Sequence, residues 1–162
     1  MKLLQLTLLC IIVGCANSPP TATTPAAATP QHPEMLELCE RFLTAPLETS
    51  PAEVRQILQF FAKSPDVIVV VDPVVAPWIS EALDNSAKQL LLAGFLAADG
   101  SSQLRSGQKA DDMYAGVAGT LRVYRALKAR NVTSPSMEAF AALDAKGELR
   151  AHLDDMLASR PH

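Results

Sequence analysis

Aromatic side chains are scarce in this chain of 162 residues, where Phe, Trp and Tyr together make up 5%. Sheet sandwiches depend on aromatic and β-branched residues, whereas the alanine and leucine that are common here favour helices. The composition therefore predicts an all-α fold, a compact bundle of roughly five to seven short helices.

Histidine is also scarce, and His32, His152 and His162 stand far apart in the sequence. Metal sites need clustered ligands, so we expect no metal and no cofactor. The motifs G-x-S-x-G, G-x-G-x-x-G, H-E-x-x-H and the P-loop are absent, which favours a non-enzymatic protein. One enzymatic alternative is a small envelope hydrolase in which His152 works with Glu148 or Asp155.

No apolar run is long enough to cross a membrane. Residues 3–13 are apolar except for Gln5 and Thr7, and at about 1.5 Å per residue they fall well short of a hydrocarbon core of ~30 Å. Lys2 precedes this run, and a small residue follows it. A basic start followed by a short apolar stretch is typical of a secretion signal.

The end of this signal reads Ile12-Val13-Gly14-Cys15 and resembles the lipobox of bacterial lipoproteins. The resemblance implies a signal peptide over residues 1–14, cleavage before Cys15, and lipidation of Cys15 by diacylglycerol and palmitate-type acyl chains. Cys10 does not fit the motif because leucines precede it. The alternative is a plain secretion signal that is cut after residue 16.

The resemblance covers residues 1 to about 17 and implies a protein anchored by lipid in a bacterial cell envelope. Ala16 follows the cysteine where inner-membrane lipoproteins of enteric bacteria carry aspartate. In a host with two membranes, the expected location is therefore the outer membrane, facing the periplasm. Two or three acyl chains give stable anchoring, whereas one chain is marginal.

Residues 15–33 form the expected tether between the lipid and the folded domain. From residue 17 to residue 33 the chain has five Pro, four Thr and four Ala but no Asp, Glu, Lys or Arg. Such a composition buries too little apolar surface to fold, and its prolines favour polyproline II. Fully extended, this stretch spans roughly 50 Å.

Residues 34–162 are expected to form one all-helical domain. Without Lys2, the chain has 13 basic against 17 acidic residues, a balance that disfavours nucleic acid as a partner. The expected partners are the membrane, through the lipid anchor, and another protein. Cys39 lies on the apolar stripe of the first expected helix, so we predict that it packs in the core.

Capping signals indicate where helices begin. Ser-Pro pairs, which suit a helix start, occur at Ser50, Ser64 and Ser134. Glu53 completes a capping box with the first of these serines, and Ser86 with Gln89 offers a second. Residues 87–98 are apolar nearly all round and are expected at the centre of the bundle.

The clearest helix is predicted over residues 111–130, beginning at Asp111 and Asp112 and ending in basic residues. Gly116 and Gly119 within it predict the close approach of a neighbouring helix. The C-terminal region is expected to form a helix, a break near Gly147 and a second helix.

Residues 67–71 are five consecutive β-branched residues, which taken alone suggest a buried strand. No other segment offers a strand partner, and unpaired backbone in a core is costly. We therefore predict a short helix from Pro65, a turn at Asp72-Pro73, and a second short helix from Trp78 to Leu83.

The proposed role is that of a helical protein-interaction module in scaffolding or assembly. Candidate interaction residues are Trp78 with its neighbours Pro77 and Ile79, and the basic pair Arg122 and Arg125; core packing of the tryptophan is the stronger alternative. A scaffold predicts an exposed apolar patch near residues 74–79. A second alternative, an immunity or inhibitor lipoprotein against a secreted toxin, predicts an acidic surface.

Overall fold

The computed structural model describes residues 32–159 of the chain. This part contains six α-helices, one short 3₁₀ helix and no strand, so the prediction of an all-α bundle is confirmed. The helices are α1 (Pro33–Thr44), α2 (Pro51–Lys63), η1 (Pro77–Ser80), α3 (Asn85–Ser106), α4 (Met113–Lys128), α5 (Pro135–Lys146) and α6 (Leu149–Ala158).

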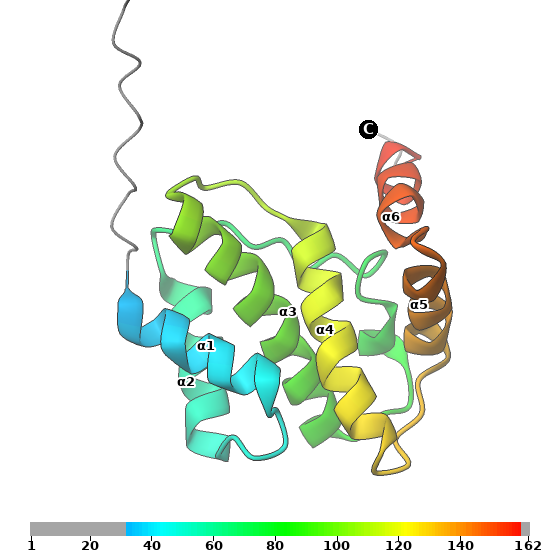
Figure 1. The fold of residues 1–162 in the computed structure, drawn as a ribbon, viewed down its shortest axis with the longest axis horizontal. Helices are drawn as coiled ribbons and strands as arrows, with labels where there is room; N and C mark the ends of the chain where they lie inside the picture. Colours follow the sequence, from blue (N-terminus) through cyan, green and yellow to red (C-terminus); the bar gives the residue numbers. More distant parts are fainter. Residues whose placement is uncertain (1–31, 160–162) are drawn as a thin grey trace, which may run out of the picture.

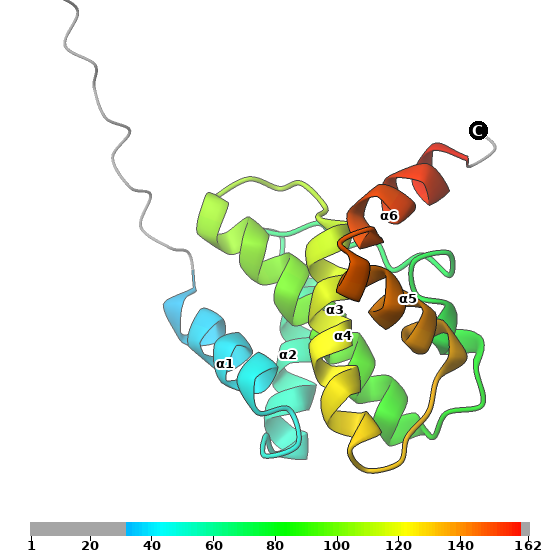
Figure 2. The ribbon, with the colours of Figure 1, turned by 45° about the vertical axis from the view of Figure 1, so that its right-hand side comes forward.

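The centre of the bundle is the pair α3 and α4. On one side of this pair lie α1 and α2, and on the other side lie α5 and α6 (Figures 1 and 2). Gly94 and Gly119 face each other where α3 and α4 cross: a Cβ on Gly94 would come 3.1 Å from the Gly119 carbonyl oxygen, and one on Gly119 would overlap the Gly94 backbone. The close approach predicted from the glycines of α4 is therefore confirmed.

Two of the four helix starts predicted from capping signals are confirmed. Ser50 and Glu53 form the predicted capping box at α2, and Ser134 caps α5 by accepting a hydrogen bond from the Met137 N–H. Two expectations were wrong. Ser64 ends α2 instead of beginning a helix, and α3 is capped by Asp84 rather than by Ser86.

The first helix and the C-terminal region also agree with the sequence. Cys39 is fully buried in α1, as predicted, and burial raises the pKa of its thiol to about 11. At residue 147 the break occurs as expected, because Gly147 adopts the left-handed conformation (φ 73°) that ends α5.

The long connection between α2 and α3 differs from the prediction. Residues 67–72 are neither helix nor strand, so no helix starts at Pro65. The turn at Asp72-Pro73 is present, because the Val75 and Ala76 N–H groups donate to the Asp72 carbonyl. The second short helix is η1, which begins at Pro77 and ends at Ser80, short of Leu83.

Within residues 32–159, no helix is both long enough and apolar enough to span a bilayer. The predicted signal peptide, Cys15 and nearly all of the predicted tether lie outside the described residues. His32, which we assigned to the tether, precedes α1 and hydrogen-bonds the Asp66 carboxylate at 3.0 Å.

Candidate functional site

Exposed apolar side chains are concentrated in one stretch, residues 67–79, which we call the 67–79 segment. Of the large hydrophobic residues in the described part of the chain, those that are exposed are Ile68, Val70, Val74 and Ile79, at 53%, 45%, 40% and 39%. Apolar residues gathered on one exposed stretch are typical of an interaction site. The patch expected near residues 74–79 is present and begins earlier, at Ile68.

The backbone of the 67–79 segment is bound by a side chain of α3, Gln103. The Gln103 side-chain amide accepts a hydrogen bond from the Ile68 N–H at 2.9 Å and donates one to the Ile68 carbonyl at 2.6 Å. Gln103 is buried, with 2% exposed. The amide thus pairs with Ile68 as a neighbouring strand would, and this pairing stabilises an irregular backbone that has no strand beside it.

A second contact holds the next exposed residue. The Val70 N–H donates to the Asp111 carboxylate at 2.9 Å. Asp111 therefore does not start the helix that we predicted from it; Asp112 caps α4 instead, through a hydrogen bond from the Ala115 N–H. These contacts fix the backbone while the side chains of Ile68 and Val70 remain exposed.

Gln103 and Asp111, the two residues that bind the segment, both lie beside a buried carboxyl group, that of Asp99. Its Oδ1 accepts from Gln103 Nε2 at 2.9 Å and from the Asp112 N–H at 3.0 Å. The Oδ2 atoms of Asp99 and Asp111 are buried and have no hydrogen-bond partner. Burial above all, and the nearby Asp111 carboxyl to a lesser extent, raise the pKa of Asp99 to about 7.

The protonation state of this pair follows from its surroundings. Two buried carboxylates that face each other repel unless a proton lies between them. We infer that Asp99 is protonated at mildly acidic pH and donates to Asp111. The anchor of the 67–79 segment therefore includes one titratable group, Asp99.

The predicted interaction residues of the 67–79 segment fall on opposite sides of its backbone. Trp78 is 1% exposed and packs in the core, so it is not a surface anchor; this is the alternative that we considered stronger. Ile79 is exposed, and Pro77 between them is half-buried. Burial of Trp78 fixes η1 against α5 and leaves Ile79 on the surface.

The two arginines predicted as a basic patch are both exposed, but their surroundings differ. Arg125 pairs with the Asp144 carboxylate at 2.6 Å, and its neighbour Lys128 pairs with Glu138 at 2.7 Å. Arg122 lines a cavity, whereas Arg125 lies outside that cavity. The arginines therefore do not act as one patch.

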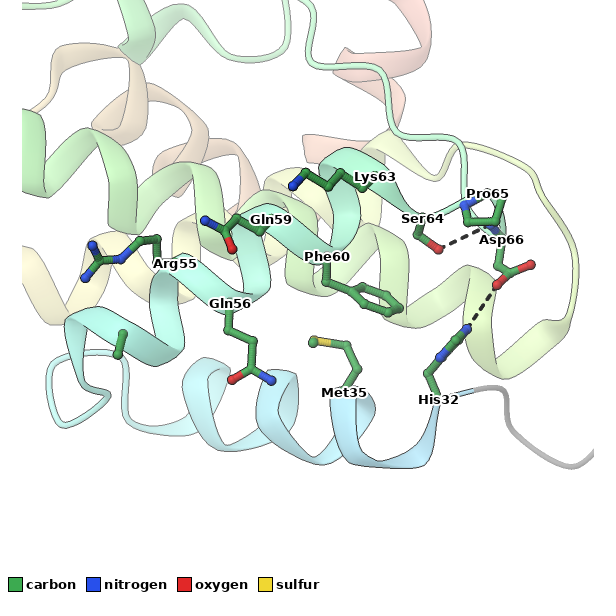
Figure 3. Close-up of a pocket in the computed structure, with 11 residues that line it drawn as sticks. His32, Met35, Arg55, Gln56, Gln59, Phe60, Lys63, Ser64, Pro65 and Asp66 are labelled. Carbon is green, nitrogen blue, oxygen red and sulfur yellow. Dashed lines mark hydrogen bonds and ion pairs between the residues drawn. The ribbon is translucent and has the colours of Figure 1, made fainter.

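A cavity of about 620 Å³ is lined by the start of α1, by α2 and by residues 64–66, which directly precede the 67–79 segment (Figure 3). Met35, Phe60 and Pro65 give it an apolar wall. The rim is polar, with Lys63 on α2 and Asp66 bound to His32 (Figure 3). The His32 ring also packs edge-on against Phe60, with centroids 5.0 Å apart.

The hydrolase alternative gains no geometric support. His152 is exposed, and its ring packs edge-on against Phe140 at 6.4 Å between centroids. His152 does not line any of the cavities described here. Over residues 32–159, no group of three or more His, Cys, Asp or Glu side chains could hold a metal ion.

Sequence reasoning missed the roles of Asp99 and Gln103. They stand four residues apart in α3, a spacing that places both on one face, and both are buried. A carboxyl and an amide in that position must find partners. The sequence thus contains a signal for a buried polar site, although it does not identify the partners.

No family model, curated protein or solved structure matches this chain.

Proposed function

We propose that this chain is a lipid-anchored cell-envelope protein whose helical domain is a non-enzymatic protein-interaction module with a scaffold or assembly role. The observation that carries the proposal is the 67–79 segment, where the exposed large hydrophobic residues of the described chain are concentrated. Exposed apolar side chains are stabilised when a partner covers them, at about 25 cal/mol per Å² of buried apolar surface.

The position of the 67–79 segment in the fold supports this proposal. The connection between α2 and α3 covers residues 64–84, and connections of this length in compact domains are commonly functional. Gln103 and Asp111 already fix its backbone. The segment therefore loses little conformational entropy when a partner binds. Such a surface suits binding without rearrangement.

The test is co-purification from envelope extract with the full chain as bait. Ile68→Asp places a charge in the patch, and Ala145→Asp places the same charge on an exposed position of α5. We expect a specific partner with the native chain and with the α5 variant, and at least a tenfold loss with Ile68→Asp. Equal recovery by all three chains would contradict the role of the 67–79 segment.

An immunity or inhibitor role is the second candidate, and an acidic cavity favours it. The cavity, of about 470 Å³, lies between α1 and α2 and is lined by Glu40, Glu48 and Glu53 together with Arg41. Such a surface suits a basic partner. For this role we expect partner binding to be lost in Glu48→Gln and unchanged in Ile68→Asp.

A further inference from the structure

Three arginines from three helices line a cavity of about 630 Å³ on a different part of the surface. They are Arg105 of α3, Arg122 of α4 and Arg150 of α6. Asp112 is the one carboxylate among the described lining residues. The cavity is therefore locally basic in a domain with an excess of acidic residues.

The guanidinium groups differ in how far they are already engaged. Arg105 pairs with Glu40. Arg150 stacks over the Tyr114 ring, with its Cζ 3.9 Å from the ring centroid. Stacking engages the face of a guanidinium and leaves its N–H edge free to donate.

Arg122 is the freest of the three. No hydrogen bond, ion pair or ring contact engages it within residues 32–159. Asp112 forms no ion pair with Arg122; the Asp112 carboxylate instead accepts from the Ala115 N–H at the start of α4. The cavity thus has unpaired positive charge at Arg122.

A buried hydroxyl also lines the cavity. Ser101 is 1% exposed, and its Oγ has no hydrogen-bond partner of ordinary geometry. The Cys39 thiol lies beside it, and a thiol is a weak hydrogen-bonding group. A buried hydroxyl without a partner is unfavourable, so a ligand oxygen within hydrogen-bond distance of Ser101 would be stabilised.

We propose that this cavity binds an organic phosphate. A phosphate group has several acceptor oxygens and up to two negative charges, which suit guanidinium groups that approach from separate helices. A carboxylate has two oxygens and is satisfied by a single arginine. Leu43, Ala98 and Ala118 supply apolar wall for the carbon portion, and the volume is in the range of small-molecule sites.

The phosphate could come from a soluble ester or from a lipid headgroup, and the experiment separates the two sources. The full chain in neutral detergent is titrated by calorimetry at constant ionic strength. One arm uses inorganic phosphate and glycerol 3-phosphate, and the other uses short-chain phosphatidic acid, whose headgroup is also a phosphate monoester. Each titration is repeated with Arg122→Gln and with the control Arg125→Gln, which removes an exposed arginine outside the cavity.

We expect saturable binding in at least one arm, weakened about tenfold by Arg122→Gln and less than twofold by Arg125→Gln. Binding of glycerol 3-phosphate identifies a soluble ester, and binding in the second arm alone identifies a lipid headgroup. The absence of saturation in both arms, or equal weakening by the two variants, would overturn the proposal. Thermal unfolding of each variant verifies that the comparison is made on folded protein.

Discussion

The side-chain amide of Gln103 binds both the N–H and the carbonyl of Ile68, at 2.9 and 2.6 Å. A residue of α3 thus gives the 67–79 segment the hydrogen bonds that a neighbouring strand would give. The exposed side chains of Ile68 and Val70 keep their positions because the backbone beneath them is bound.

Replacing Gln103 by alanine tests this anchor. Both hydrogen bonds to Ile68 and the one to Asp99 would be lost, and we expect the free energy of unfolding to fall by about 1–3 kcal/mol. Urea unfolding measures the loss, and hydrogen exchange at the Ile68 amide should accelerate. Gln59→Ala, on the exposed face of α2, is the control and should change neither quantity. Unchanged exchange at Ile68 in Gln103→Ala would contradict the anchor.

The pKa of Asp99 predicts how stability depends on pH. An aspartate in the unfolded chain has a pKa of about 4, and in the folded domain burial raises the pKa of Asp99 to about 7. The folded domain therefore binds a proton that the unfolded chain releases between these values. The protonation of Asp99 therefore adds to the free energy of unfolding below about pH 4, and this contribution is lost as the pH rises through about 7. Its size is on the order of a few kcal/mol.

Asp99→Asn isolates this contribution, because asparagine keeps the shape of the protonated acid and can donate to Asp111. We expect the variant and the native chain to be similarly stable at about pH 4, and the variant to become the more stable of the two as the pH rises to 8. Chemical unfolding across this range measures both. Parallel pH profiles for the two chains would show that Asp99 is not the titrating group.

Much of the fold could be predicted from local sequence. The capping box of Ser50 and Glu53 and the glycine that ends α5 depend on contacts within a few residues, and both were predicted correctly. The buried stripe of α1 was also correct, since its 3.6-residue period can be read directly. Local signals determine where these helices begin, end and face the core.

The 67–79 segment could not be predicted in the same way. Residues 67–71 are all apolar and β-branched, so no alternation of polar and apolar residues indicates which side chains are exposed. The groups that bind this backbone, Gln103 and Asp111, lie 35 and 41 residues beyond their partners. We expected this backbone to need hydrogen-bond partners, but we considered only neighbouring strands as partners. Side chains supplied them, so the exposed patch became visible only in the structure.

The proposed lipidation of Cys15 would hold the domain at a membrane, and Cys15→Ser tests this proposal. Metabolic labelling with palmitate should label the native chain and leave the variant unlabelled. The variant should also lose processing before residue 15 and stable membrane association, because the acyl chains provide the anchor. A variant that is still processed and bound to membranes would contradict the lipoprotein assignment.

The most direct test of the central claim is site-specific photo-crosslinking in living cells. A photoreactive amino acid replaces Ile68 or Ile79 in the full chain, and a third chain carries it at Ala145. We expect the same discrete adduct from both positions of the 67–79 segment and none from the position on α5. An adduct from Ala145 alone, or no adduct from either isoleucine position, would contradict it.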